Sequence, residues 1–270
     1  MDNATAYQPI PEPVVELDVF PPQQQRRWTV LLRLILAIPQ LIVLWALGIA
    51  AAVVAIIGWF AALFTGALPQ WAGDFLRSYV AYNVRVSGYM MLLVDAYPPF
   101  TLETGPDYPV RAWFPNATPL NRLAVLFRFF LALPILILTS WFASGWMVIS
   151  FIVWLIVLIT GRMPAALFQA TTVVLRNQVR TSAYWYMLTP TYLKQVFGDG
   201  AAPEAGATLP PGYVPASPTR PLLVSQAGKI LLWVILVLGI LASIAQGVTR
   251  STTDVDDDDY SSMISYSHTY

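Results

Sequence analysis

The feature that most constrains this chain is a repeat at a spacing of 95 residues that contains a long apolar block. Residues 27–97 align without a gap on residues 122–192, with 22 identical residues in 71 positions. Apolar composition alone would not place arginines, prolines, a Thr-Gly pair and a tryptophan in register. Both copies are therefore expected to come from a duplication and to fold alike. The matched landmarks are Arg33 and Arg128, Pro39 and Pro134, Trp59 and Trp154, Thr65-Gly66 and Thr160-Gly161, and Arg85 and Arg180.

Each copy has the same order of segments. A short alternating stretch, at 14–20 or 110–114, predicts a strand. The apolar block follows and ends at a Thr-Gly-x-x-Pro motif, where glycine suits a helix C-terminus and proline prevents its continuation. An aromatic-rich amphipathic helix closes the copy. The expected ranges are 27–65 and 122–160 for the apolar blocks, and 71–94 and 166–188 for the amphipathic helices.

Composition places these blocks in a lipid bilayer. The chain is 57% hydrophobic and only 11% charged, against about 25% charged residues in an average soluble domain. The apolar residues form long runs, which favours a membrane over a soluble core. The expected fold class is mainly α and integral to the membrane, with two tandem repeats, one C-terminal transmembrane helix and a small cytoplasmic β element.

The apolar blocks at 27–65 and 122–160 are too long for single upright spans. A helix of about 39 residues is about 58 Å long, whereas the hydrocarbon core is about 30 Å thick. We therefore expect each block to form a hairpin of two helices, with turns near Gly48 and at 143–145. The second helix of each hairpin is short, so a full crossing and a wedge that stops partway both remain open.

The basic residues favour hairpins that begin and end on one face of the membrane. With hairpins, every lysine and arginine except Arg250 falls on that face. Single spans would place Arg77, Arg85, Arg111 and Arg122 outside, against the tendency of basic loops to stay in the cytoplasm. We expect a multi-pass protein of the plasma membrane, with the N-terminus and the large loops cytoplasmic and the acidic C-terminal tail outside.

The remaining segments complete the expected organisation. The stretch before the last apolar run is rich in Pro, Gly and Ala and is typical of a flexible linker. The predicted segments are a polar N-terminal tail (1–13), repeat 1 (14–107), repeat 2 (108–197), the linker (198–228), a transmembrane helix (229–249) and an acidic tail (250–270).

The composition excludes several kinds of chemistry. The chain has no cysteine, and its single histidine is His268, two residues from the end. Thiolate chemistry is absent, and zinc, haem and Ser-His sites normally need a histidine held by a packed scaffold. Asp74 and Asp95 have no acidic counterparts in the second copy, so no paired carboxylates emerge. We expect no enzyme activity, no catalytic residue, no metal site, no cofactor and no nucleic-acid partner.

The repeated arginines are the most suggestive polar residues. Charges within or beside apolar segments are costly and often functional. Near the cytoplasmic boundary such side chains can also extend toward lipid phosphates. We expect contacts with anionic headgroups; the alternative is a shared groove that holds an anionic lipid or the carboxylate of a partner. The residues are Arg33, Arg128, Arg85 and Arg180.

Several short motifs give the chain a family resemblance. They are the Arg-x5-Pro spacing of Arg33 and Arg128, the two Thr-Gly-x-x-Pro breaks, Tyr-Pro-Pro-Phe at 97–100 and Tyr-Pro-Val-Arg at 108–111. The chain resembles bacterial, actinobacterial-type membrane proteins that carry the domain of unknown function numbered 4389. The resemblance covers residues 14–195. It implies a membrane location and a repeated architecture, and it implies no activity.

Two functions follow as expectations. The first is a non-enzymatic integral membrane scaffold or accessory subunit, with membrane lipids and a protein in the membrane as partners. The second is a lipid or small-solute binding or transport protein, with its site between the two repeats. The scarcity of polar groups in the apolar segments favours the first.

Overall fold

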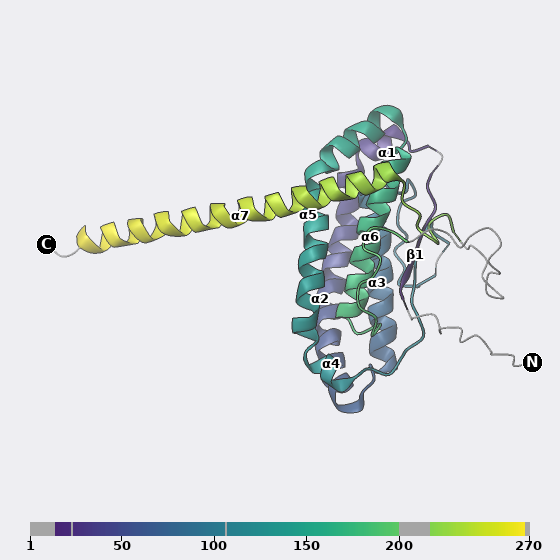
Figure 1. The fold of residues 1–270 in the computed structure, drawn as a ribbon, viewed down its shortest axis with the longest axis horizontal. Coiled ribbons are helices and arrows are strands. Elements are labelled where there is room, and N and C mark those ends of the chain that lie inside the picture. Colours follow the sequence, from purple (N-terminus) through teal and green to yellow (C-terminus); the bar gives the residue numbers. More distant parts are fainter. Residues whose placement is uncertain (1–13, 23, 106, 200–216, 268–270) are drawn as a thin grey trace, which may run out of the picture.

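The described part of the chain is mainly helical (Figure 1). The computed structural model describes residues 14–22, 24–105, 107–199 and 217–267; His268, the tail 1–13 and most of the linker lie outside them. Both repeats give the same order of elements, as the duplication predicts. The elements are β1 (Glu16–Val19), α1 (Arg27–Leu31), α2 (Arg33–Thr65), α3 (Gln70–Met90), β2 (Val110–Trp113), α4 (Arg122–Leu126), α5 (Arg128–Thr160), α6 (Ala165–Trp185) and α7 (Gln226–Ser267).

Each apolar block forms one long helix after a short first turn, so the predicted hairpins within 27–65 and 122–160 are wrong. α2 and α5 each run for 33 residues, straight through Gly48 and through 143–145. A lone glycine among strong helix formers costs about 1 kcal/mol, which is too little to force a turn. The first turn of each block is set apart as α1 or α4.

The chain reverses at the Thr-Gly-x-x-Pro motifs instead. Gly66 and Gly161 end α2 and α5 in the left-handed conformation, with φ of 80° and 70°, which glycine adopts without steric cost. Pro69 and Pro164 then occupy the N-cap positions of α3 and α6. The amphipathic helix of each repeat therefore folds back along its own long helix.

The two repeats interlock around an approximate twofold axis. β1 and β2 pair antiparallel, and each short helix packs on the long helix of the other repeat, α1 on α5 and α4 on α2. Matched hydrogen bonds fix both junctions: Trp59 Nε1 donates to the Val125 carbonyl at 2.9 Å, and Trp154 Nε1 to the Val30 carbonyl at 2.8 Å. The N-terminal end of α2 therefore lies beside the C-terminal end of α5, so the long helices are antiparallel.

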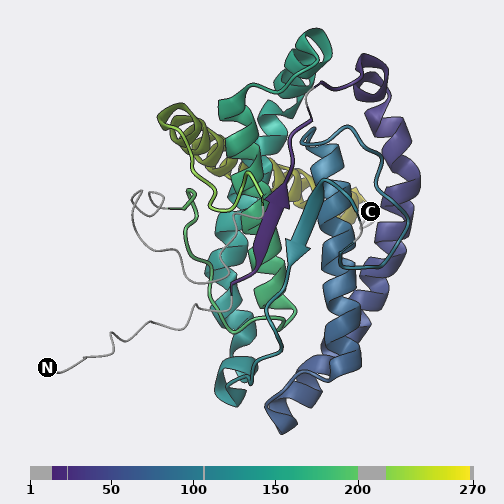
Figure 2. The same ribbon diagram turned by 90° about the vertical axis from the view of Figure 1, so that its right-hand side faces the viewer.

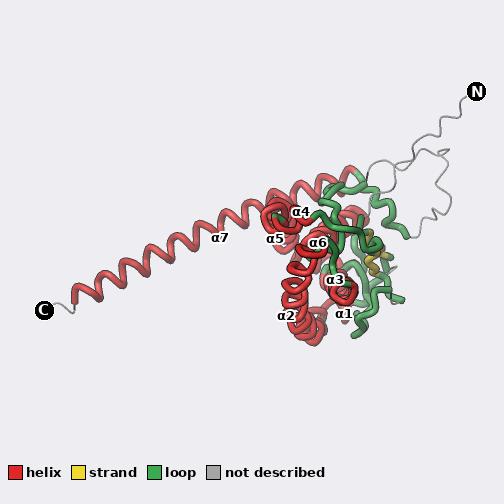
Figure 3. The backbone as a smooth tube through the Cα atoms, turned by 90° about the horizontal axis from the view of Figure 1, so that it is seen from below, coloured by secondary structure: helices red, strands yellow, loops and turns green. Residues whose placement is uncertain are grey.

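The elements are arranged in layers (Figures 2 and 3). α2 and α5 form one outer layer, α3 and α6 lie behind them, and the two-stranded sheet and the loops cover the opposite side. The main apolar core lies between these layers and joins both repeats; Leu76 and Val84 of α3 belong to it with Leu175 and Val179 of α6. The outer faces of α2 and α5 carry exposed apolar side chains along their whole length.

α7 runs across α5 rather than along it (Figures 1 and 3). The two backbones touch where they cross. A Cβ atom on Gly145 would lie 1.7 Å from the carbonyl oxygen of Ile235, and one on Gly239 would lie 1.8 Å from that of Trp141. Only glycine fits at such an approach, and small residues are typical of close helix crossings in membranes.

Three helices are long and apolar enough to cross a membrane: α2, α5 and the part of α7 at Gln226–Gly247. By length and composition alone, these three apolar helices suggest a multi-pass membrane protein. They agree with the membrane location and the C-terminal transmembrane helix expected from the sequence.

Candidate functional site

Arg33 and Arg128 begin the two long helices and occupy matched buried sites. The Nη1 atom of Arg33 donates to the carbonyls of Tyr89 and Val94 at 2.6 and 3.0 Å, and its guanidinium lies over the Tyr89 ring, 4.4 Å from the centroid. Arg128 makes the equivalent bonds at 2.7 and 2.6 Å and has a ring 4.2 Å away. The acceptors and ring in repeat 2 belong to Tyr184 and Thr189, 95 residues further along.

These bonds hold the ends of α3 and α6. The last carbonyls of a helix have no partner within it, and an arginine can bind them. Leu92 and Met187, just beyond the two helix ends, both have φ of 62°, so the chain turns sharply there. Each arginine therefore clamps the start of a long helix to the end of the helix that folds back along it.

Arg85 and Arg180 tie loops to α3 and α6. Arg85 donates to the carbonyl of Glu103 at 2.8 Å and to that of Thr101. Arg180 donates to the carbonyl of Lys194 at 3.1 Å and reaches β1 as well. Burial lowers the pKa of both guanidinium groups, although an arginine keeps its charge in proteins.

All four predicted site arginines lie inside the protein, with exposed fractions of 5% or less. The structure places Arg33 and Arg128 at opposite ends of the outer layer, because α2 and α5 are antiparallel. Contact of the four groups with anionic headgroups stays a prediction. Within the protein, each buried guanidinium needs acceptors, and the free carbonyls of helix ends and loops supply them.

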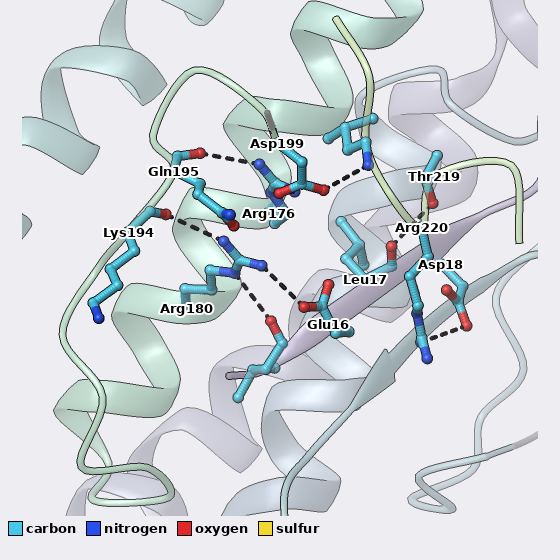
Figure 4. A network of polar contacts seen from close by, with 12 residues as sticks. Glu16, Leu17, Asp18, Arg176, Arg180, Lys194, Gln195, Asp199, Thr219 and Arg220 are labelled. Atoms are coloured by element: carbon cyan, nitrogen blue, oxygen red, sulfur yellow. Dashed lines mark hydrogen bonds and ion pairs between the residues drawn. The ribbon is translucent and has the colours of Figure 1, made fainter. Parts of the chain in front are cut away.

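A polar network that the sequence did not reveal joins α6 to β1 and to the segment before α7 (Figure 4). Arg176, with an exposed fraction of 1%, donates to the carboxylate of Asp199 at 2.9 Å. Asp199 also accepts from the backbone N–H of Leu222 at 2.6 Å. Glu16 of β1 accepts from Arg180 at 3.3 Å. Burial raises the pKa of the Glu16 carboxyl, and the nearby Arg180 offsets part of that rise.

Asp18 is the second centre of this network. Its carboxylate accepts from the hydroxyl of Ser217 at 2.6 Å, from Arg220 at 2.9 Å and from the indole of Trp113. Thr219 donates to the Leu17 carbonyl at 3.0 Å. The strands thus fix the chain just before α7, which sets where α7 begins.

The carboxylates of this network are paired with arginines. Within the described ranges, no group of three or more His, Asp or Glu residues is placed to hold a metal ion. Asp18, Asp199 and Glu16 each face an arginine, so these carboxylates are engaged in holding elements together.

A cavity of about 400 Å³ lies between the repeats. It lies between α2 of repeat 1, the start of α5 and the end of α6 of repeat 2. Its lining is mostly apolar, with Arg128 as the charged member. The lining residues are Ala52, Ala55, Ile56, Trp59, Arg128, Phe129, Trp185, Tyr186 and Met187.

Comparison with known proteins identifies the repeats. The profile of the domain of unknown function DUF4389 matches residues 27–101 and again residues 122–192, together more than half of the chain. Among curated proteins and among solved structures, none matches. The two matched segments are the two interlocked units described above. The chain therefore belongs to the DUF4389 family and carries its domain twice.

Proposed function

We propose that the chain is a non-enzymatic membrane scaffold or accessory subunit. The observation that carries this proposal is how the buried charges are used. The guanidinium groups of Arg33, Arg128, Arg85 and Arg180 bind the chain's own carbonyls, and the carboxylates of the network face arginines. Such an interior stabilises a rigid body whose two surfaces, one apolar and one polar, are free to contact lipid and protein.

The proposed setting is a bacterial plasma membrane, of the actinobacterial type that the resemblance implies. The N-terminus and the loop side are assigned to the cytoplasm, and the acidic residues at the end of α7 to the outside. The support is that β1 and the end of α7 lie on opposite sides of the helix layers (Figure 1). Basic loops favour the cytoplasmic side of a membrane.

The loop side offers a place for a protein partner. The loop after α3 exposes Phe100 and Leu102, with exposed fractions of 59% and 41%. Exposed aromatic and aliphatic groups rimmed by polar residues are typical of interaction sites. We expect the full chain, extracted with its native lipids, to carry a second protein in a fixed ratio. Native mass spectrometry would measure that ratio.

Two double variants, one on the loop side and one on the outer face of α2, test whether the loop side binds the partner. Phe100→Ser with Leu102→Ser should lose the partner, whereas Phe64→Ser with Ile57→Ser, on the outer face of α2, should keep it. Recovery of the wild-type chain with lipids alone would contradict the scaffold proposal.

A second candidate function is lipid binding, and the cavity between the repeats favours it. Its volume of about 400 Å³ lies in the range of small-ligand pockets, which are mostly apolar with few polar groups. We propose an acyl chain as the occupant. Ala55→Trp should fill the cavity and remove a bound lipid from the native mass spectrum, whereas Ala46→Trp, an exposed position on the same helix, should not. Equal lipid adducts in both variants would contradict this candidate.

A further inference from the structure

The outer layer of α2 and α5 is apolar on one face only. The buried face of α2 carries Arg33, Gln40 and small residues such as Gly58 and Ala62. The outer face has no charged residue between Leu34 and Phe64, and its large apolar side chains are exposed. A helix of 33 residues is about 50 Å long. The layer is thus a long apolar surface backed by a polar body.

Length argues against an upright position for these helices. To fit about 50 Å of helix into a hydrocarbon core of about 30 Å, the axis must tilt by more than 50°, whereas spanning helices tilt by about 0–40°. A helix that lies flat has no such mismatch.

The polar side of the protein argues against upright helices more strongly than their length does. The sheet and the loops lie alongside the helices, over the far side of α3 and α6, rather than only beyond the helix ends (Figures 2 and 3). Glu103, Asp107 and Lys194 are exposed there. Upright helices would place much of this side at membrane depth, where a charged side chain costs at least about 2.5 kcal/mol. With the helices flat, the same residues stay in water.

The basic residues at the two ends of the layer also favour flat helices. Because α2 and α5 are antiparallel, Arg27 and Arg162 lie at one end and Arg122 at the other; Arg27 donates to the Ile159 carbonyl at 3.2 Å, and Arg122 lies beside Gly66. Upright helices would put one of these ends outside the cell, against the positive-inside tendency. Flat helices put both ends at the cytoplasmic headgroups.

The point where α7 crosses α5 indicates how deep α5 lies in the bilayer. It crosses α5 at Ile235–Gly239 and leaves the layer on the side away from β1 (Figure 1). Beyond Gly239, ten uncharged residues precede Arg250, which is about 15 Å of helix. One leaflet contributes about 15 Å of hydrocarbon. The crossing point therefore fits an α5 that lies within one leaflet while α7 passes through the other.

We infer that α2 and α5 lie flat within the cytoplasmic leaflet, with acyl chains covering their outer faces, and that α7 is the one helix that crosses the bilayer. The occupant of the apolar face is thus the lipid leaflet itself. The inference rests on the membrane location of the chain and is independent of a scaffold or lipid-carrier role.

Depth measurements on spin labels test this directly, because the chain has no cysteine. Single cysteines are placed in the full chain, labelled, reconstituted in phospholipid vesicles, and compared by their collisions with oxygen and with a water-soluble nickel chelate. The α2 positions are Leu34, Trp45, Val53 and Phe64, and the α7 control positions are Ile230, Val237 and Ile244; all seven are exposed.

We expect the four α2 labels to show no depth trend along the helix, while the α7 labels go from shallow to deep and back. The α7 series also reports that each preparation is folded and inserted. An upright α2 would change depth by about 16 Å between positions 34 and 45. A maximum of depth in the middle of α2, with shallow ends, would overturn the inference.

Discussion

The two repeats keep the same internal frame but differ in what covers them. In both, an arginine at the start of the long helix holds the last carbonyls of the helix that folds back. Only repeat 1 adds a carboxylate, since Asp95 lies 3.5 Å from Arg33 and Pro190 stands at the matching position. Only repeat 2 carries α7, which packs on α5 and α6. The comparison separates the residues that make the fold from those that adapt each copy.

The two repeats are most alike in the arginine bonds of this shared frame. Buried donors that bind backbone carbonyls do not depend on the identity of the side chains that supply those carbonyls. The surroundings of an arginine can therefore diverge, as Val94 and Thr189 have, while the bond persists. The packing of α7 on α5 depends on one close crossing of the two backbones. This crossing has no counterpart in repeat 1 among the described residues.

The largest expected effect comes from blocking the close crossing of α5 and α7. Gly145→Ala places a Cβ atom 1.7 Å from the Ile235 carbonyl, so α7 must move, and we expect a loss of about 3 kcal/mol in the free energy of unfolding. Gly48→Ala serves as the control in repeat 1, two positions before Ala50, which matches Gly145; its Cβ atom meets its nearest atom at 3.4 Å, so the change should be neutral or slightly stabilising. Denaturant unfolding in mild detergent gives both values; equal effects would show that the close crossing is not formed.

The next effect tests the shared frame. Arg33→Gln and Arg128→Gln each leave buried carbonyls without their donor, and each should cost about 2 kcal/mol. Lysine should restore little at position 128, because two different nitrogens of the guanidinium, Nε and Nη2, reach the two carbonyls there and lysine has only one nitrogen. The same unfolding measurement applies. If only one variant is destabilised, the two clamps are not equivalent.

Much of the fold could be predicted from the sequence, because its signals are local. The strand-like stretches, the glycine and proline that end each apolar block, and the order of helices in both copies follow from periodicity and turn chemistry. The hairpins were wrong for a physical reason. A helix of about 58 Å does not fit upright in a hydrocarbon core of about 30 Å, and this mismatch led to the predicted turn at Gly48. A helix that lies flat has no such limit.

The site could be predicted only in part. The four repeated arginines stood out because charge is rare in this chain, but their acceptors are carbonyls, which have no sequence signature. Arg220 and Asp18 bind each other across 202 positions. Arg176 gives no repeat signal, because Ala81 stands at its matching position in repeat 1. Long-range pairs of this kind follow from the packing of the repeats rather than from any local pattern.

The smallest effect concerns Glu16, whose matching position in repeat 2 is Arg111. Burial raises the pKa of Glu16 above its ordinary value of about 4.5, so folding favours the protonated form. The stabilisation is present below pH 4.5 and is lost as the pH rises through the higher pKa of the folded state. Because Glu16 is partly exposed, the change should stay below about 1 kcal/mol. Glu16→Gln should flatten the pH dependence of unfolding in this window. A pH dependence equal to that of the wild type in Glu16→Gln would contradict this assignment.

The most direct test of the account is the side of the membrane on which the two long helices end. Thr65 and Thr160 are both exposed, and antiparallel α2 and α5 place them at opposite ends of the layer. Thr65→Cys and Thr160→Cys would be treated in intact cells with a membrane-impermeant maleimide, then again after permeabilisation. Flat helices predict that both cysteines are protected in intact cells and react only after permeabilisation. Reaction of one cysteine from outside, with the other protected, would show that the helices cross the bilayer and would contradict the account.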